Sequence, residues 1–495
     1  MIIRWICKNC NKKWIYPVEK CVHCKGHISK QKGTMLKVIG ITKVNIPSPM
    51  HPITPYNIIL LEDEHGSKMP KKTMKEYSIG DNYVEQRASY DDAVSVVKKK
   101  YDAYEAVKSA VELANQSDFF MPTCKFLIKP SIAVSAYCYQ AATTNPEVVN
   151  AVIQLLLESG VKKEDIIVAE QGFAGVDAAE AASRAGILEV CKKHGIQFQD
   201  ISKGPFEHIG SEMKFSVFKE SIGRKIINIP VMKTSQQFGI SGSVENLLRL
   251  ADEPTQTMIF ENDFDKAMPK LAKAISENSK ILTIADATLG MQGQGPTALG
   301  EPAFLNLVFA SGNSVNIDAV FCDVAMLDIP LHILESESIG IGKSKIEDIE
   351  VVGNEPDALR YPLKKAEKGQ TAHPDISLIE GKACSSCFNS AISLTSKLVG
   401  LRGEKIAVAI GPMLTKNMIE EASKTKKVFI FGDCAISKLK KEGIAMPASI
   451  SEKADSLEQL LLLKKLLTTK GKTTISTLDR AATKITKAIS HIIGE

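Results

Sequence analysis

The sequence predicts a multidomain protein. A small zinc ribbon and a β-barrel come first, then an α/β domain with a mainly parallel sheet, and then a C-terminal α/β extension. Three observations lead to this prediction: two CxxC pairs near the N-terminus, short alternating strands after them, and a regular succession of strands and helices from residue 119 onward. At 495 residues the chain is also too long for one ordinary hydrophobic core.

Composition indicates an ordinary globular protein. Charged residues make up 24% of the chain, and the net charge is only +5, which argues against nucleic acid as the main partner. No apolar run approaches the roughly 20 residues of a membrane span, and no secretion signal precedes the first cysteines. We therefore expect a cytoplasmic location without membrane attachment. There, the eleven cysteines would serve as metal ligands or buried thiols.

Residues 1–30 predict a zinc ribbon. They hold two CxxC pairs separated by ten residues: Cys7, Cys10, Cys21 and Cys24. Each pair directs two thiolates at one ion, and four thiolates in tetrahedral array suit a closed structural Zn²⁺ site. A rubredoxin-like iron site has the same geometry, so zinc and iron both remain candidates. The metal would replace the core that so short a segment cannot build.

Residues 31–86 predict a small β-barrel. Short β-like runs are separated by glycine turns, and the matching motifs are Thr54-Pro55-Tyr56, Glu62-Asp63 with Gly66, and Ile79-Gly80-Asp81. With the four cysteines, these motifs resemble the acyl-CoA-associated zinc-ribbon and OB-fold proteins of domain-of-unknown-function family 35. The resemblance implies docking on a partner such as a thiolase and guidance of the pantetheine arm of CoA. An OB fold can also bind nucleic acid, but this segment lacks interleaved aromatic and basic residues.

Residues 87–118 have apolar positions at helical spacing and predict a linker helix. An α/β domain over residues 119–355 follows. Its first full helix is expected after Asn145, which can cap it, with a first-turn proline and an acid next in sequence. Strands on both sides of this helix form a βαβ unit, which implies a parallel sheet.

Several strands of this domain deliver polar groups at their carboxyl ends: Lys129, Glu170, Lys233 and Asp286. Those ends share one edge of a parallel sheet, so the four groups are candidates for one site. Two ammonium groups beside glycine-rich turns suit an anionic small molecule. The stretch 281–302 is expected to run from a strand into a glycine-rich loop, where Gly293 and Gly295 let a ligand approach the backbone. No standard nucleotide fingerprint is present.

A second resemblance covers roughly residues 120–355. The motifs that carry it are Lys129-Pro130, Thr143 to Val149, Pro230 to Thr234, Asp286-Ala287 with Gly293 to Pro296 and Gly300, Val315 to Val320, and Gly340-Ile341-Gly342. They look like domain-of-unknown-function family 362, which is often fused to ferredoxin-type iron–sulfur modules. The resemblance implies an iron–sulfur context but no reaction. This sequence departs from the family at Ser131, where Asn is usual, and at Glu245, where Lys is usual.

Residues 380–470 predict a C-terminal α/β region with a CxxC at a helix start. Cys384 and Cys387 form this pair, and Cys434 follows a later strand. Three thiolates can hold a [4Fe–4S] cluster, or Zn²⁺ with Asp433 or His373 as fourth ligand. A site of buried thiols without metal is the other alternative, because relatives carry a further cysteine where the turn at 443–447 has none. A helical tail over residues 471–495 is expected to pack on the body or on a second copy in a homo-oligomer.

Three functions follow from these features. The first is an iron–sulfur-linked enzyme or redox component that binds an anionic small molecule. The second is a non-catalytic accessory or scaffold subunit of a thiolase-type acyl-CoA enzyme. The third is nucleic-acid binding through the OB fold. The sequence assigns no reaction, because it shows no Ser-His-Asp set and no Walker motif.

Overall fold

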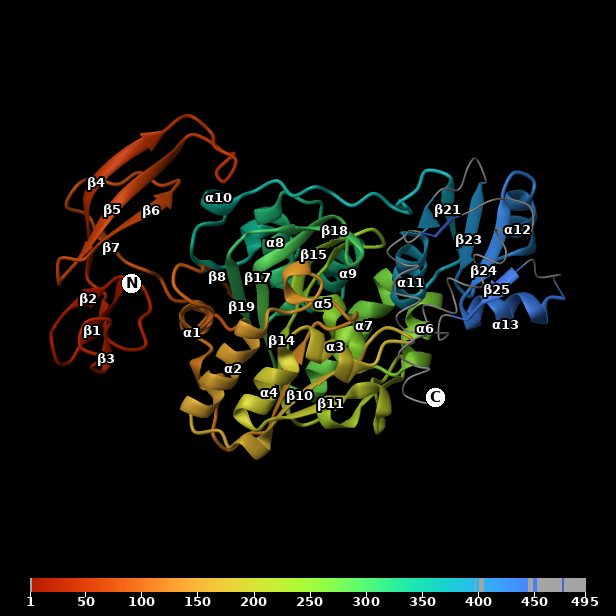
Figure 1. Ribbon diagram of the computed structural model, residues 1–495, viewed down its shortest axis with the longest axis horizontal. Helices are drawn as coiled ribbons and strands as arrows, with labels where there is room; N and C mark the ends of the chain where they lie inside the picture. The colour runs from red at the N-terminus through yellow and green to blue at the C-terminus, as the bar shows by residue number, and fades with distance from the viewer. Residues whose placement is uncertain (1, 397, 400–404, 444–447, 452–473, 476–495) are drawn as a thin grey trace.

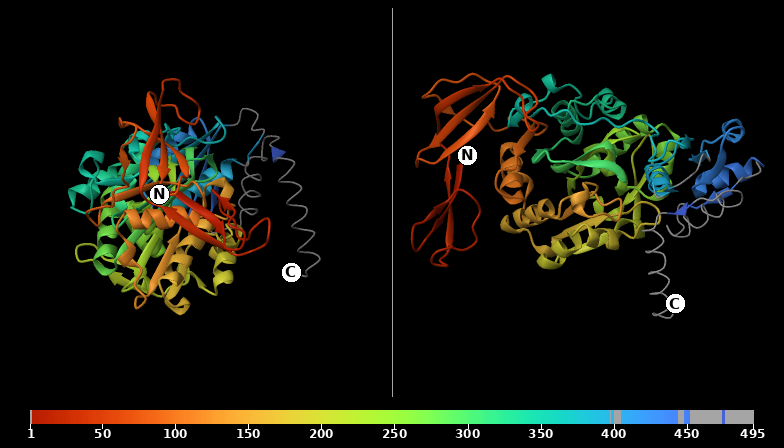
Figure 2. Two further views of the ribbon diagram at one scale, coloured as in Figure 1. Left: turned by 90° about the vertical axis from the view of Figure 1, so that its left-hand side faces the viewer. Right: turned by 45° about the horizontal axis from the view of Figure 1, so that its top comes forward.

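The computed structural model describes residues 2–396, 398–399, 405–443, 448–451 and 474–475 (Figures 1 and 2). Its strands and helices form a mixed α/β architecture with several separate sheets. Two antiparallel sheets lie at the N-terminal end, a large sheet lies in the middle, and a parallel sheet of the C-terminal region lies at the other end (Figure 1). In the described part of the chain, no helix combines the length and the apolar character of a bilayer span.

The N-terminal region consists of two antiparallel sheets. The first has the order β2-β1-β3 and the second the order β6-β5-β4-β7. Their strands are β1 (Ile2–Cys7), β2 (Lys13–Trp14), β3 (Ile28–Gly33), β4 (Leu36–Val44), β5 (Tyr56–Asp63), β6 (Lys68–Thr73) and β7 (Asn82–Tyr83). Antiparallel pairing agrees with the short alternating strands that the sequence indicates, while the zinc-ribbon and OB-fold assignments stay predictions.

The central sheet runs β11-β10-β9-β14-β17-β19-β8-β20, and its first five strands are parallel. Its strands are β8 (Val94–Lys98), β9 (Phe126–Pro130), β10 (Ile166–Glu170), β11 (Gln197–Asp200), β14 (Lys225–Ile229), β17 (Ile281–Gln294), β19 (Leu307–Ser311) and β20 (Val351–Gly353). Strands β15 (Val231–Ser235), β16 (Gly239–Ser241) and β18 (Leu299–Ala303) extend the sheet beside β17. A mainly parallel sheet is therefore confirmed.

Helices cover both faces of the central sheet. Along β9, Phe126 and Ile128 pack on one face, while Leu127 packs on the other. The first face is covered by α1 (Ala103–Leu113), α2 (Pro146–Glu158), α3 (Ala178–Arg184) and α4 (Ile187–His194). The second is covered by α6 (Glu253–Glu261), α7 (Phe264–Asn278), α8 (Ser314–Ala325) and α9 (Leu331–Ser338). Burial on both faces explains the almost uninterrupted apolar runs of these strands.

Two segments differ from their expected secondary structure. Residues 87–118 do not form one helix, because Val94–Lys98 is the strand β8 of the central sheet and only Ala103–Leu113 is helical. The glycine-rich stretch after Ile281 is not a loop, because β17 continues to Gln294 and pairs with β18 in a hairpin. In both cases pairing with distant strands overrides the local pattern.

The C-terminal region holds a parallel sheet of order β21-β23-β24-β25. Its elements are β21 (Ile376–Glu380), α11 (Ser385–Ser396), β23 (Ile406–Ile410), α12 (Lys416–Ser423), β24 (Lys427–Phe431), α13 (Asp433–Lys441) and β25 (Ala448–Ile450). Most of the expected helical tail lies outside the described residues. Within it, Thr474–Ile475 form the strand β26, which pairs with β22 (Leu398–Val399).

The remaining short elements connect these layers. They are β12 (Phe206–Ile209) and β13 (Phe215–Phe218), which pair as a hairpin, the helices α5 (Ser243–Asn246) and α10 (Pro356–Leu359), and single 3-10 turns such as η2 (Cys138–Gln140) and η6 (Leu247–Leu250). Helix α5 and η6 follow β16 directly, so they lie over the carboxyl ends of the central strands, where the candidate site is found.

Candidate functional site

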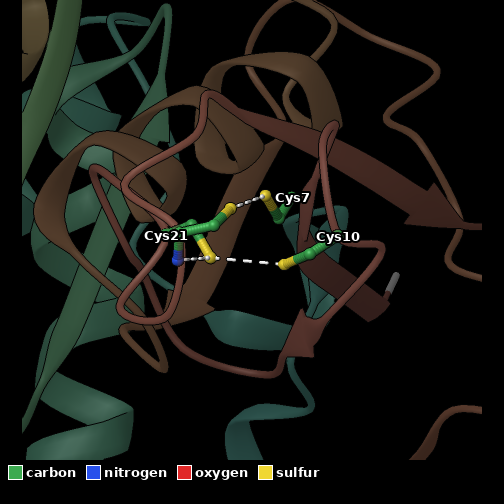
Figure 3. Close-up of side chains that lie close together, drawn as sticks. Cys7, Cys10 and Cys21 are labelled. Atoms are coloured by element: carbon green, nitrogen blue, oxygen red, sulfur yellow. Dashed lines mark hydrogen bonds between the residues drawn. The ribbon is translucent and has the colours of Figure 1, made fainter.

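The four N-terminal cysteines converge on one point (Figure 3). All four sulfur atoms lie within 4.8 Å of one another, with 3.4 Å between Cys7 and Cys24 and 3.5 Å between Cys10 and Cys21. Strand β1 ends at Cys7, and the Asn9 backbone N–H donates to its sulfur, as in a metal-binding knuckle. Tetrahedral thiolates around a zinc ion are about 3.8 Å apart, so this set fits one metal ion.

The four thiols influence one another: the pKa is lowered at Cys7 and Cys21 and raised at Cys10 and Cys24. Burial raises the pKa of the Cys21 thiol, but hydrogen bonds outweigh it, first from the Cys24 backbone N–H, and the pKa is about 6. Cys7 and Cys21 are fully buried, whereas Cys10 and Cys24 are exposed. Among the described residues, this is the one group of three or more cysteine, histidine or acidic side chains whose ligand atoms all lie within 4.8 Å of one another, as a single ion requires.

At the carboxyl edge of the central sheet, Lys129 of β9 and Glu170 of β10 form a buried ion pair. The Lys129 ammonium lies 2.9 Å from the Glu170 carboxylate, and both side chains are almost fully buried. Burial lowers the pKa of Lys129, and Glu170 opposes that shift. The carboxylate also accepts hydrogen bonds from the backbone N–H groups of Ile132 and Gln171.

Lys233 of β15 lies in the same region with fewer partners. Its ammonium donates to the Ala142 carbonyl oxygen at 3.2 Å, and its pKa is lowered to about 8 by burial, an effect opposed first by Glu245. One carboxylate oxygen of Glu245 is buried without a hydrogen-bond partner, and so is the amide oxygen of Gln236. This part of the edge therefore has two unused hydrogen-bond acceptors in addition to the Lys233 amine.

The structure does not bring Asp286 to these lysines. Its carboxylate accepts hydrogen bonds from the Asn145 backbone N–H at 2.8 Å and from Thr288 at 2.7 Å. Asp286 thus holds the start of α2, and burial raises its pKa while those hydrogen bonds oppose the rise. Gly293 and Gly295 lie in the β17–β18 hairpin, where the Gly293 carbonyl oxygen accepts from the Thr234 hydroxyl at 2.8 Å.

The three C-terminal cysteines meet around Cys387. Its thiol is hydrogen-bonded to both Cys384 and Cys434, and these contacts, followed by burial, raise its pKa well above the usual range. Cys387 is in the first turn of α11, and Cys434 is in the first turn of α13. His373 is engaged elsewhere, because its Nδ1 atom accepts from the Asp375 backbone N–H at 3.2 Å.

Arg249 interacts both with Glu170 of the buried ion pair and with Cys384 of the C-terminal cysteines. It was not among the site residues expected from the sequence. Its guanidinium stacks 4.3 Å above the Phe173 ring and donates to Gln256. Burial lowers its pKa, while the charges of Glu170 and Cys384, among others, oppose that shift. A lone arginine inside the apolar run Leu247–Leu250 was the signal in the sequence, since a buried arginine needs charged partners.

Direct contacts hold the CxxC helix over the sheet edge. The Ala174 backbone N–H donates to the Ser386 hydroxyl at 2.7 Å, and the Ser385 hydroxyl contacts Glu245 at 3.4 Å. Gln237 donates to the carbonyl oxygen of Ala383 at 3.0 Å. A cleft of about 890 Å³ opens next to these contacts, and Phe173 and Ala142 belong to its walls. The cleft therefore lies next to the contact between Ala174 and Ser386, which joins α11 to the sheet edge.

Two known proteins resemble parts of this chain. The chain is 25% identical over 229 residues to "Thylakoid-associated protein sll1697" of Synechocystis sp., an alignment that covers 44% of this chain and 67% of that protein. A solved structure, "Ltp2-ChsH2(DUF35) aldolase", shows 18% identity over 18% of this chain and 75% of that chain, with a TM-score of 0.15. A likeness this weak carries no argument about the N-terminal region.

The family match is confined to the central sheet. Residues 126–323 match the family described as "Domain of unknown function (DUF362)". That segment contains Lys129, Glu170, Lys233 and Arg249, but neither set of clustered cysteines. Less than half of the chain is covered, so the match supports the predicted resemblance for the sheet domain and leaves the N- and C-terminal regions to structural argument.

Proposed function

We propose that this protein is an iron–sulfur-linked redox component or enzyme that binds an anionic small molecule at the carboxyl edge of its central sheet. The observation that carries the proposal is the position of Arg249, which interacts with both Glu170 and Cys384. A positive group next to Cys384 favours the thiolate of that residue, the form that binds metal. The cysteine cluster and the buried lysines thereby share one electrostatic environment.

The donor set fits an iron–sulfur cluster with three protein ligands. Cys384, Cys387 and Cys434 approach one another from the starts of two helices, whose N-terminal N–H groups favour negative charge. A cluster held there would supply one-electron transfer. Zinc is the alternative occupant, because three thiolates also suit Zn²⁺. At the N-terminal site, four thiolates in a closed array favour a structural zinc ion.

Metal analysis tests this proposal directly. We expect anaerobically purified protein to contain one zinc and about four irons with matching sulfide. Cys387→Ser should lose the iron and keep the zinc. Cys191→Ser changes a buried lone cysteine and should retain both metals. If wild-type protein holds no iron or sulfide after reconstitution, and shows no EPR signal on reduction, the iron–sulfur assignment is wrong.

Lys233 is the group best suited to an anion. Its ammonium has one hydrogen-bond acceptor from the protein and lies behind Ala142, a residue of the cleft wall. With inorganic phosphate and oxalate as probes, Lys233→Met should weaken binding about tenfold or more, the range for a hydrogen bond to a charged group. Lys192→Met, which alters an exposed lysine, is the matched control. Equal affinities for the two variants would contradict this role.

A second function, docking onto an acyl-CoA enzyme, is favoured by the surface of the N-terminal sheet. Three apolar side chains near the cysteine knuckles are largely exposed: Ile15 at 67%, Tyr16 at 56% and Val22 at 62%. Exposed apolar side chains that gather in a small module are typical of an interaction site. The partner that we propose is a thiolase-type enzyme, with the module as its accessory subunit.

The docking function has its own test. Purified thiolase from the same organism should co-elute with the protein in size-exclusion chromatography, and Ile15→Ser with Val22→Ser should abolish the complex. Met121→Ser, at another exposed apolar position, should leave it intact. Separate elution of the two wild-type proteins would rule out this partner without bearing on the iron–sulfur proposal.

A further inference from the structure

The wall of the 890 Å³ cleft carries an exposed tyrosine pair that the proposed function does not use. The rings of Tyr137 and Tyr139 are parallel within 8°, with centroids 5.3 Å apart. Tyr139 is 65% exposed and lines the cleft, whereas Tyr137 lies outside the lining. An aromatic face of this kind in a cleft is unsatisfied apolar surface, and a flat ring would cover it.

The tyrosine pair is held in place by its surroundings. The Arg184 guanidinium lies 5.9 Å from the Tyr137 ring and also lines the cleft. The segment that carries the tyrosines packs through Ala136 and Ala142 against Met291 of β17. Its backbone is fixed at Ala133, whose carbonyl oxygen accepts from the Phe173 N–H at 2.8 Å. Tyr139 is therefore pre-organised, which lowers the entropic cost of stacking a ligand against it.

The rest of the cleft is polar in a way that suits a heterocycle. Helix α11 contributes Asn389, Ser390 and Ser393 to the lining, and the hairpin tip contributes Thr297. The Thr297 hydroxyl donates a hydrogen bond to the Asn389 amide oxygen at 2.8 Å, which links the hairpin to α11. Amide and hydroxyl groups can pair with the polar edges of a ring whose face stacks on a tyrosine. The volume falls within the usual range for small-molecule sites, roughly 300–1,000 Å³.

From these features we propose that the cleft binds a heteroaromatic small molecule, whose planar ring stacks on Tyr139 and whose polar edge faces α11. The ring would lie close to Arg249, because Phe173 lines the cleft and carries the Arg249 guanidinium on its face. One part of this inference rests on the proposed function, namely that the bound ring takes part in electron transfer. Binding itself depends on the tyrosine and the cleft, and is testable without the metal.

Flavin mononucleotide and adenosine monophosphate are suitable ring-bearing probes, and ribose 5-phosphate is the matched probe without a ring. Flavin fluorescence should be quenched saturably by the full-length protein, because stacking on tyrosine quenches it, and calorimetry should detect the purine. Ribose 5-phosphate should displace neither flavin mononucleotide nor adenosine monophosphate. Displacement by ribose 5-phosphate at equal concentration would assign binding to phosphate and overturn the proposal, as would failure of both ring probes to bind.

Variants locate the ring. Tyr139→Leu should weaken binding about tenfold or more, the range for loss of one ring–aromatic stack. Tyr90→Leu is the control, because Tyr90 is similarly exposed at 69% but does not line the cleft. Unfolding midpoints close to wild type for both variants would exclude misfolding as the cause. Wild-type affinity of Tyr139→Leu would overturn the assignment. Iron and sulfide are measured on the same wild-type samples: ring binding without iron would contradict the redox proposal alone, and iron without ring binding would contradict this one alone.

Discussion

At the carboxyl edge of the central sheet, several charged side chains are buried together. Lys129, Glu170 and Arg249 are charged side chains that are almost entirely buried. Removing a charge from water costs several kcal/mol, and partners must offset this cost. Each of the three has such a partner, so the cluster is stable only as a set. Replacing one of the three should therefore lower the free energy of unfolding measurably, because it leaves another buried charge without its partner.

Replacement of Lys129 by alanine should reduce the free energy of unfolding by about 3–5 kcal/mol, because Glu170 is left as an unpaired buried charge. Denaturant unfolding followed by circular dichroism measures this change. Lys192→Ala breaks the exposed pair with Glu189 and should cost less than about 1 kcal/mol. Similar losses for the two variants would show that the Lys129–Glu170 pair is not buried in solution.

Asp318 of α8 should make stability depend on pH. Its carboxylate accepts from the backbone N–H groups of Ser243 and Val244 at 2.6 and 2.9 Å, and it holds the turn that carries Glu245. Burial raises its pKa from 3.8 to about 6, although those two N–H groups oppose the rise. A raised folded-state pKa gives stability that is fully present below about pH 4 and is lost as the pH rises through 6.

The measurement compares wild type with Asp318→Asn in urea unfolding from pH 4 to pH 7. Over this interval the free energy of unfolding of the wild type should fall by about 3 kcal/mol relative to that of the variant, which is the equivalent of about two pKa units. Asp328→Asn, which changes an exposed acid, should show no such trend. If the difference in free energy of unfolding between wild type and Asp318→Asn stayed constant from pH 4 to pH 7, the pKa of Asp318 would not be raised by folding.

At the scale of elements, the β17–β18 hairpin decides how the sheet edge is shaped. Strand β17 pairs with β14 and β19 in its first half and with β15 and β18 in its second half. The glycines of the hairpin allow neighbouring backbones to approach closely. A Cβ atom on Gly295 would lie 2.2 Å from the Thr234 carbonyl oxygen, while one on Gly293 would meet nothing.

Gly295→Ala should therefore destabilise the protein more than Gly293→Ala. At Gly293 the cost is that of a positive φ of 71°, about 1 kcal/mol. At Gly295 the backbone of β15 must move, which adds roughly 1–3 kcal/mol. The thermal unfolding midpoints of the two variants show which substitution destabilises the protein more. The hairpin would pack more loosely than the structure shows if Gly293→Ala proved the more harmful.

At the scale of the whole molecule, separate modules are attached to the central sheet by a few polar contacts. The N-terminal sheets contact the body through Glu355, which accepts from the Thr73 hydroxyl at 2.8 Å and from the Met74 N–H at 2.9 Å. The C-terminal region is attached through α11. The two outer modules lie on opposite sides of the central region in Figure 1 and in the right view of Figure 2. A cytoplasmic location and homo-oligomer formation stay predictions.

Removal of the metal ion from the N-terminal site should affect only the N-terminal module. The first sheet has few buried side chains, among them Ile3 and Trp5, so the metal supplies much of its folding energy. After chelation, backbone amides of residues 2–33 should exchange hydrogen faster, while those of residues 126–170 stay protected. Cys21→Ser should reproduce this pattern and Cys124→Ser should not. Uniform loss of protection along the chain would show that the sheets unfold together.

Sequence by itself determined the features that depend on local spacing. The four N-terminal cysteines were found because each CxxC pair folds as a local turn, and Lys129 and Glu170 were placed together because parallel strands end at one edge. The helix after Asn145 follows from its own capping residues. The cysteine turns and the helix cap involve residues that are close in sequence. Only the Lys129–Glu170 prediction also required the assumption that the two strands are parallel neighbours.

Only the tertiary structure decided the contacts between segments that are distant in sequence. Strand β8 resembles a helix locally and becomes a strand because β19 and β20, more than 200 residues later, pair with it. Asp286 was expected beside the lysines, but its side chain binds the start of α2. Arg249 meets Cys384 because α11 packs on the sheet edge. Burial and pairing energies come from the whole fold, so local pattern does not contain them.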